Sequence, residues 1–349
     1  MSSRVLVTAA GSIVAQGIIK SLKLANKKSK RYTIIAADMS PLAAGLYRCD
    51  RGIIVPPVSS PDYIDNIIDT CQENDIEAIF CGSDDELLLL ASAKNKIERN
   101  TRAKLLTGSI EALAIARDKW STFQFCKANN LPFAPSALPE EEEEFAGEFG
   151  FPIVIKPREG YGSAHFYIAK NKGEVKKAVS AIKTAGWRPI LQKYLAANEE
   201  FTTGITVDNN VNYVMSSISI RKIIKHGQTY KAFIDDFYAI RKSAEEIGLK
   251  LRACGPINVQ AKLEGDLPIV FEINPRFSAT CPMRAVAGVN EPDIVFKNTV
   301  LGQRIKVNGY QRLICMRYWN EVYVPYSLYE KTTIDGEIET DGSFIPDYF

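Results

Sequence analysis

Short apolar, β-branched runs alternate with amphipathic segments of helical length over roughly the first 115 residues. The apolar runs cover residues 4–8, 32–37, 52–55, 78–81 and 104–106, and the helical patterns cover 13–24, 61–74 and 84–95. Such alternation is typical of a parallel sheet with helices on both faces. We therefore expect an N-terminal α/β domain at residues 1–115.

The pattern changes after residue 115. A helix is expected at 118–129, and the five glutamates of residues 140–144 are typical of a solvated helix start. Strand-like runs follow at 153–156, 165–169, 190–195, 202–207, 213–219, 257–263 and 269–273, with a helix at 172–185. Turn residues at 208–210 and 264–266 predict antiparallel pairing. We expect an antiparallel α+β region divided into 116–195 and 196–305, then an aromatic-rich extension at 306–349.

Composition excludes several classes of function. The 349 residues include 43 Lys and Arg against 41 Asp and Glu, so no strong basic field favours nucleic acid or a membrane surface as a partner. Only two histidines, His165 and His226, are present, which excludes a multi-histidine metal centre within the chain. Seven cysteines without C-x-x-C spacing favour reduced thiols and a cytoplasmic location. No apolar stretch approaches the roughly 18 residues of a membrane span.

The segment 151–163 places a lysine and two glycines after a predicted strand. Lys156 ends the strand, and Gly160 and Gly162 lie in the loop that follows. Exposed backbone N–H groups of such a loop can surround phosphate oxygens while the lysine neutralises their charge. A plain hairpin loop, in which glycine only permits positive φ, explains the segment equally well.

A second cluster of polar residues lies on the hairpin predicted at 255–276. Glu272 and Asn274 leave one face of their strand, while Phe271 and Ile273 are expected on the other face. An odd number of loop residues would bring Gln260 to the polar face, and an even number would not. Three such oxygen donors suit Mg²⁺ that is also held by phosphate. Arg276, just after Pro275, can reach a phosphoryl group.

The order of these motifs resembles that of the ATP-grasp ligases. The order is Lys119 at a helix start, the lysine and glycine loop, the segment Gln192 to Leu195 followed by Glu200, then Gln260 and the Glu272-x-Asn274-Pro275-Arg276 motif. The resemblance spans about residues 4–305 and is strongest to the branch similar to one half of the carbamoyl-phosphate synthase large subunit. It implies an ATP-grasp fold preceded by a Rossmann-like α/β domain.

The resemblance also implies a role for each matching residue. ATP would be bound by Lys119, Lys156, Gly160, Tyr161, Gly162, Ser163, Gln192, Lys193, Tyr194, Leu195 and Glu200, with Mg²⁺ or Mn²⁺ at Gln260, Glu272 and Asn274, and with Arg276 and Lys156 as catalytic residues. Two departures from the family pattern stand out. Ser163 is followed by Ala164 and His165 instead of continuing the glycine motif, and Gln192 replaces a frequent glutamate.

Four further residues are weaker candidates for substrate contact. Arg221 corresponds to a basic residue that faces the acceptor in relatives, although a cross-strand ion pair explains it equally well. Asp85 and Glu86, together with the neighbouring Asp84, follow a predicted strand and can face substrate, but a helix N-terminus favours acidic residues without any function.

The implied activity is ATP-dependent joining of a small-molecule carboxylate to an amine through an acyl phosphate, with release of ADP and phosphate. A related alternative is carbamoyl-phosphate-synthase-like phosphorylation of a small carboxylate or carbamate. Two other classes stay open: an NAD(P)-binding oxidoreductase, suggested by Gly11 and Asp38 around the first predicted strand and helix, and a nucleotide-binding regulator without turnover. The aromatic extension can complete a pocket or a homodimer interface.

Overall fold

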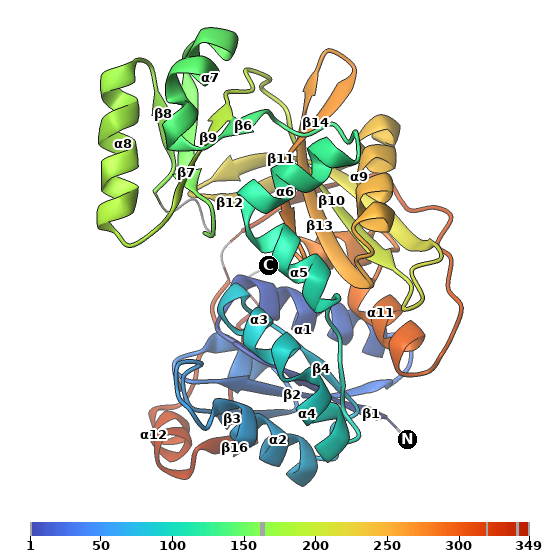
Figure 1. The fold of residues 1–349 in the computed structure, drawn as a ribbon. Helices are drawn as coiled ribbons and strands as arrows, with labels where there is room; N and C mark the ends of the chain where they lie inside the picture. The colour runs from blue at the N-terminus through green and yellow to red at the C-terminus, as the bar shows by residue number, and fades with distance from the viewer. Residues whose placement is uncertain (1, 161–164, 319, 340–341, 348–349) are drawn as a thin grey trace.

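The computed structural model describes residues 2–160, 165–318, 320–339 and 342–347, which form three sheets surrounded by helices (Figure 1). The first sheet has the strand order β16-β3-β2-β1-β4-β5, and its strands β1 to β5 run parallel. Its N-terminal elements are β1 (Ser3–Val7), α1 (Ile13–Asn26), β2 (Tyr32–Asp38), η1 (Ala44–Arg48), β3 (Arg51–Ile54), α2 (Tyr63–Glu73), β4 (Ala78–Phe80), α3 (Asp84–Ser92), α4 (Lys94–Asn100) and β5 (Lys104–Leu105).

The loops after β1 and β4 are held by close backbone contacts and short-range caps. Ser12 caps α1 by accepting a hydrogen bond from the Ala15 N–H, and Ser83 caps α3 through the Glu86 N–H. Gly82 must lack a side chain, because a Cβ there would lie 2.0 Å from the Thr8 carbonyl oxygen. These contacts fix the starts of α1 and α3 at the carboxyl edge of the parallel strands.

Two helices lead into a small four-stranded sheet, which forms a separate lobe at the upper left of Figure 1. Its elements are α5 (Ile110–Arg117), α6 (Lys119–Ala128), β6 (Ser136–Ala137), η2 (Pro139–Glu141), α7 (Glu142–Phe149), β7 (Ile153–Pro157), β8 (Tyr167–Ala169), α8 (Lys172–Thr184) and β9 (Pro189–Lys193). One face, including Ile153, Ile155 and Leu191, packs with Phe145 and the α8 residues into a local core. The opposite face of the four-stranded sheet does not take part in this local core.

The third sheet is antiparallel, as the hairpin turns predict, with the order β14-β13-β10-β11-β12-β15. Its elements are β10 (Glu200–Val207), β11 (Val214–Lys225), β12 (Gln228–Ile234), α9 (Tyr238–Lys250), β13 (Gly255–Glu264), β14 (Leu267–Asn274), α10 (Cys281–Val286), α11 (Glu291–Thr299) and β15 (Leu313–Met316). One face, with Phe201, Ile205 and Val259, packs against α9.

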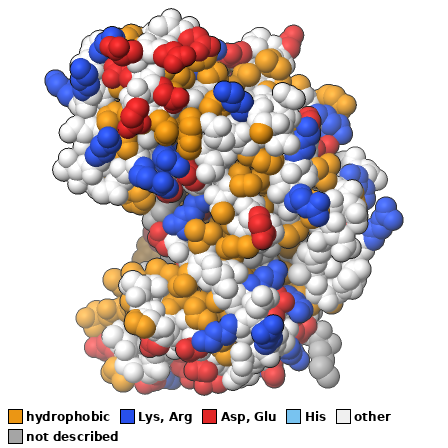
Figure 2. Space-filling model, viewed as in Figure 1, with side chains coloured by type: hydrophobic (Ala, Val, Ile, Leu, Met, Phe, Trp, Pro, Cys, Tyr) orange, Lys and Arg blue, Asp and Glu red, His pale blue; other side chains and the backbone are white. Residues whose placement is uncertain are grey.

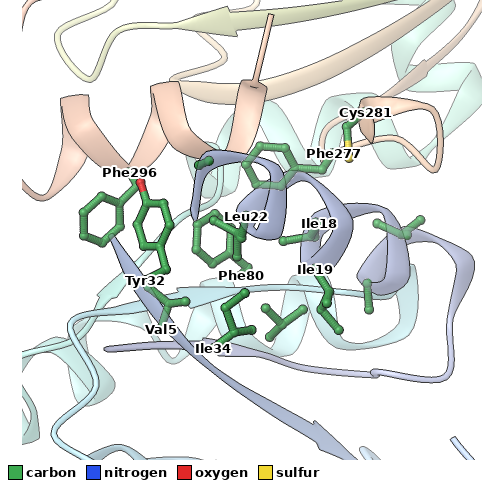
Figure 3. Close-up of a cluster of buried hydrophobic side chains, with 14 of the residues drawn as sticks. Val5, Ile18, Ile19, Leu22, Tyr32, Ile34, Phe80, Phe277, Cys281 and Phe296 are labelled. Carbon is green, nitrogen blue, oxygen red and sulfur yellow. The ribbon is translucent and has the colours of Figure 1, made fainter. Parts of the chain in front are cut away.

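A shared hydrophobic core joins the N-terminal domain to this third sheet. Helix α1 packs against α10 and α11, and Figure 3 shows Tyr32 beside Phe296 and Phe80 beside Phe277. The ring centroids of these pairs are 5.0 and 5.7 Å apart. One cluster of buried side chains contains residues of both regions, such as Val5 of β1 and Ile234 of β12. The N-terminal domain and the third sheet therefore pack around a common core.

The C-terminal extension returns to the N-terminal sheet. After β15 it forms α12 (Tyr326–Asp335) and β16 (Glu337–Glu339), and β16 pairs antiparallel with β3. The parallel pairing expected for residues 1–115 is confirmed for β1 to β5, and the C-terminal extension adds an antiparallel edge strand that was not predicted. No helix of the described residues is long and apolar enough to cross a membrane.

Candidate active site

A cavity of about 440 Å³ lies where the small sheet, the antiparallel sheet and the N-terminal domain meet. The space-filling view shows a hollow between the upper lobe and the lower domain, with Lys and Arg side chains at its edge (Figure 2). Twelve of the residues singled out in the sequence line this cavity: Lys119, Lys156, Gly160, Gln192, Lys193, Tyr194, Leu195, Glu200, Gln260, Glu272, Asn274 and Arg276. Tyr161, Gly162 and Ser163 lie outside the described residues.

The polar face of the β13–β14 hairpin is produced by a β-bulge. Its turn contains two residues between the paired Glu264 and Leu267, an even number that by itself would place Gln260 on the wrong face. Gln260 pairs with Glu272 but the next pair is Ala261 with Val270, so Phe271 is the extra residue. The bulge restores the common face of Gln260 and Glu272. It also brings Phe271 to the cavity wall, so its expected place with Ile273 on the opposite face was wrong.

Lys156 is a buried ammonium at the base of the cavity. Lys156 lies on the same face of β7 as Val154, and Val154 pairs with Gln192 of β9. The Lys156 Nζ donates to Gln192 Oε1 at 2.8 Å and to the Phe271 carbonyl at 3.3 Å. Burial lowers the pKa of Lys156 to about 7, and the nearby Lys119 adds to this effect. A negatively charged ligand beside Lys156 would favour its protonated form.

Glu272, Asn274 and Gln260 supply the oxygen atoms of the same face. Burial alone would raise the pKa of Glu272, but Lys119, Lys156 and the Asn274 amide lower it below its usual range. Asn274 Nδ2 donates to Glu272 Oε1 at 3.0 Å, and Gln260 Oε1 accepts from Lys222 Nζ at 2.5 Å. Glu272 is therefore ionised, and a cation bound to Gln260 would lie close to Lys222.

The donor set fits a nucleotide-bound cation better than a free one. No group of three or more His, Cys, Asp or Glu residues suited to a metal occurs in the described part of the chain. One carboxylate and two amides provide too little charge to hold Mg²⁺ alone, whereas phosphate oxygens would complete its coordination. The residues fit Mg²⁺ or Mn²⁺ only together with an anionic ligand.

Lys119 joins the start of α6 to the loop after β7. Its Nζ donates to the Gly160 carbonyl at 2.9 Å and to the Arg158 carbonyl at 3.4 Å. Arg158 in turn forms an ion pair with Asp118, which caps α6 through the Trp120 N–H. Lys119 therefore both lines the cavity and fixes the beginning of the glycine loop.

Arg276 is held by a residue of the N-terminal domain. Its Nε and Nη2 donate to the two carboxylate oxygens of Asp84, each at 2.9 Å, and its Nη1 donates to the Phe277 carbonyl at 3.1 Å. Burial would lower the pKa of Arg276, but Asp84 raises it. The sequence suggested that Asp84, the first residue of α3, can face substrate, but its contact with Arg276 was not predicted, because the two residues are 192 positions apart.

The other three weaker candidates do not line the cavity. Arg221 lies on the opposite face of β11 from Lys222, where it pairs with Glu199 at 2.6 Å and stacks over Phe233, which is the cross-strand ion pair considered above. Glu86 is buried and accepts hydrogen bonds from Thr8 and Tyr63, so it stabilises the N-terminal domain instead of facing substrate. Asp85 is exposed on α3.

Other cavity residues were missed by the sequence reasoning. Lys222, Lys262 and Thr202 lie on the cavity face because they pair with Glu200 or Gln260. That alternation is visible in the sequence, but the register that selects Lys222 instead of Arg221 is not. Residues from distant segments complete the wall, namely Ile13, Val14, Ser278, Ala279, Thr280 and Arg317.

The features that suggested an oxidoreductase have a local structural use. Asp38 accepts a hydrogen bond from the Gly11 N–H at 2.7 Å and another from the Ser40 N–H at 2.9 Å. Its carboxylate thus binds the β1–α1 loop directly. Neither Gly11 nor Asp38 lines the cavity described above.

Two family models match the chain. Residues 5–103 match the PylC-like N-terminal domain, and residues 188–321 match the ATP-grasp in the biosynthetic pathway with Ter operon. Among curated proteins, the carbamoyl phosphate synthase large chain of Clostridium acetobutylicum is 25% identical over 266 residues, which cover 71% of this chain and 24% of the relative. That of Methanosphaerula palustris is 21% identical over 329 residues, 88% of this chain and 31% of the relative. The chain thus spans about a quarter to a third of these relatives.

Solved structures give the same fold. N5-carboxyaminoimidazole synthetase from Staphylococcus aureus complexed with ADP superposes with a TM-score of 0.70 at 16% identity, covering 95% of this chain and 86% of that one. The biotin carboxylase domain of 2-oxoglutarate carboxylase from Hydrogenobacter thermophilus, solved with MgADP and bicarbonate, gives 0.69 at 18% identity, covering 88% and 72%. The chain thus matches a PylC-like N-terminal model over residues 5–103 and an ATP-grasp model over residues 188–321, is similar in sequence to the carbamoyl phosphate synthase large chains, and shares the fold of these solved structures.

Proposed function

We propose that this protein is an ATP-dependent carboxylate–amine ligase. The observation that carries the proposal is the meeting of Lys156, Lys119, Glu272, Asn274 and Arg276 in one cavity, although they come from α6, β7, β14 and the loop after β14. Buried lysines beside an ionised glutamate suit a triphosphate with its cation. The proposal also draws on relatives and structural neighbours that include ATP-grasp enzymes crystallised with ADP or MgADP.

Residues at different positions in the cavity would have different roles. Gln192 to Leu195, where β9 ends in the cavity wall, would contact the adenine, and Glu200 the ribose. Lys119 and Lys156 would bind phosphate oxygens, and Gln260, Glu272 and Asn274 would hold Mg²⁺ or Mn²⁺ against them. When bound, the metal neutralises negative charge on the phosphates and orients them. Arg276, already oriented by Asp84, would stabilise the phosphoryl group during transfer.

The reaction needs no protein nucleophile. An oxygen of the substrate carboxylate attacks the γ-phosphorus of ATP, the bond to ADP breaks, and an acyl phosphate forms. The amine then attacks the acyl carbon, loses a proton and displaces inorganic phosphate. Catalysis comes from positioning and charge stabilisation, which agrees with a cavity whose described lining contains no histidine or cysteine.

A second candidate is phosphorylation of a small carboxylate or carbamate, as in a carbamoyl phosphate synthase. It is favoured by similar curated proteins, five of which are large chains of that enzyme. The two candidates differ in the second step, because only the ligase requires an amine acceptor. Homodimer formation and a cytoplasmic location also stay predictions.

The test is ADP release with Mg²⁺ and panels of acids and amines, followed by mass analysis of the product. We expect release to depend on one acid and a condensed product to require one amine. Glu272→Gln should abolish release, whereas Glu246→Gln, on the exposed surface of α9, should not change it. Full activity of Glu272→Gln, or tight NADH binding without ATP turnover, would contradict the proposal.

A further inference from the structure

Arg317 brings the C-terminal extension into the cavity wall. Its backbone N–H donates to the Tyr230 carbonyl at 3.0 Å, which continues the pairing of β15 with β12. Its Nη2 donates to the Ala279 carbonyl at 2.8 Å, and Arg317 and Ala279 both line the cavity. Of the five N–H donors of the partly buried guanidinium, only one is thus used by a described partner.

No carboxylate of the described residues forms an ion pair with Arg317. Gly17 of α1 lies against α10, since a Cβ there would be 3.3 Å from Cys281 Sγ, and Lys20 follows one turn later on the same side of α1. Partial burial lowers the pKa of Lys20, and the charge of Arg317 lowers it further. Lys20 itself does not line the cavity.

Arg276 and Arg317 therefore differ in how their positive charge is compensated. Asp84 compensates the charge of Arg276 through a bidentate contact. For Arg317, burial lowers the pKa of the guanidinium, and the groups that act in the opposite direction are the thiols of Cys315 and Cys281. A partly desolvated guanidinium without a carboxylate partner is unfavourable unless an anion binds to it. No residue of the described chain supplies that anion.

We propose that Arg317, with the neighbouring Ser278 and Thr280 of the same cavity wall, forms a subsite for a second anionic group of the acid substrate, separate from the carboxylate that is phosphorylated. This inference rests on the proposed ligase function and names its substrate class: a small acid that also carries another carboxylate or a phosphate. The planar guanidinium suits either group. Ser278 and Thr280, whose hydroxyls lie 2.9 Å apart in the same wall, add further donors.

Direct binding provides the first test. The MgADP-saturated protein is titrated with inorganic phosphate or glutarate, and its temperature of half-unfolding is measured at each concentration. The apparent dissociation constants of wild type, Arg317→Met and Arg312→Met are then compared. Arg312 is the matched control, because it lies in the same extension but is exposed and paired with Asp235. We expect Arg317→Met to weaken binding of one probe roughly tenfold to hundredfold and Arg312→Met to leave it unchanged. Equal binding by all three proteins would overturn the subsite.

Turnover provides the second test, with acid pairs that differ in one anionic group. Glutarate is compared with valerate, and 3-phosphoglycerate with glycerate, by ADP release. Arg317→Met should raise KM for the doubly anionic member roughly tenfold to hundredfold, with kcat and the singly anionic member little changed. Loss of kcat at unchanged KM would instead place Arg317 on the reacting carboxylate. If no acid releases ADP, the ligase function fails, while the binding test still decides the subsite.

Discussion

Arg276 and Asp84 form a bidentate ion pair across the boundary between the antiparallel sheet and the N-terminal domain, with both contacts at 2.9 Å. The arginine follows β14 and the aspartate begins α3, so two distant segments fix the direction of one guanidinium. Such a pair can position a catalytic arginine before any substrate is bound.

Asp84→Asn should lower kcat roughly tenfold or more, with a small effect on the KM for ATP, because the guanidinium loses its bidentate partner. ADP release under saturating substrates measures the effect. Asp65→Asn is the control, since Asp65 forms only a surface pair with Lys96 in the same domain. An unchanged kcat for Asp84→Asn would show that the pair has no positioning role.

The buried Lys156 should make the stability of the ligand-free protein depend on pH. Its pKa is about 7 in the folded protein against an ordinary value of 10.5, so the unfolded chain binds more protons between these limits. The contribution of Lys156 to stability should therefore rise between about pH 7 and 10.5, by up to about 1.4 kcal/mol per pH unit. Below pH 7 both states are protonated and this contribution becomes flat.

Urea denaturation at several pH values measures this dependence. Lys156→Met should remove the rise, whereas Lys177→Met, at an exposed position on α8, should keep it. The same slope in wild type and Lys156→Met would mean that Lys156 is not the responsible group.

Nucleotide binding should be coupled to proton uptake by the same lysine. At pH 8 the Lys156 amine is mostly neutral in the free protein, because its pKa is about 7, and a triphosphate beside it would raise that pKa. Calorimetry in buffers with different ionisation enthalpies should detect uptake approaching one proton per nucleotide. Lys156→Met should bind more weakly and show no such uptake; an undiminished uptake would assign the proton to another group.

The buried ion pair between Arg284 and Glu291 should be essential for stability. Arg284 is fully buried and also donates to Asn258 Oδ1 at 2.8 Å, next to the cavity. Arg284→Met should destabilise the protein by roughly 3–5 kcal/mol, because it leaves Glu291 without a compensating charge. Urea denaturation measures this, and adding Glu291→Gln should recover part of the loss. A change below about 1 kcal/mol would contradict the assigned role of the pair.

The sequence was informative where local pattern decides structure. The alternating runs predicted strands β1 to β5 and the helices between them, and the motif order predicted the ATP-grasp fold. Alternation alone could not reveal the Phe271 bulge, which depends on how two strands pair. It could not predict the β16–β3 pairing or the Arg276–Asp84 contact either, since both join segments far apart in the chain.

The single helix predicted at 84–95 is another feature that local pattern did not predict correctly. It breaks at Ala93 into α3 and α4, although no glycine or proline marks the break. The roles of the individual cavity residues stay predictions, since the sequence pattern proposes them and the structure brings their side chains together.

The most direct test of the central claim is a crystal structure of the protein with magnesium and a non-hydrolysable ATP analogue. We expect the triphosphate to lie between Lys119, Lys156 and the Glu272–Asn274 pair, with the adenine against residues 192–195. A nucleotide bound instead at the β1–α1 loop, beside Gly11 and Asp38, would contradict it.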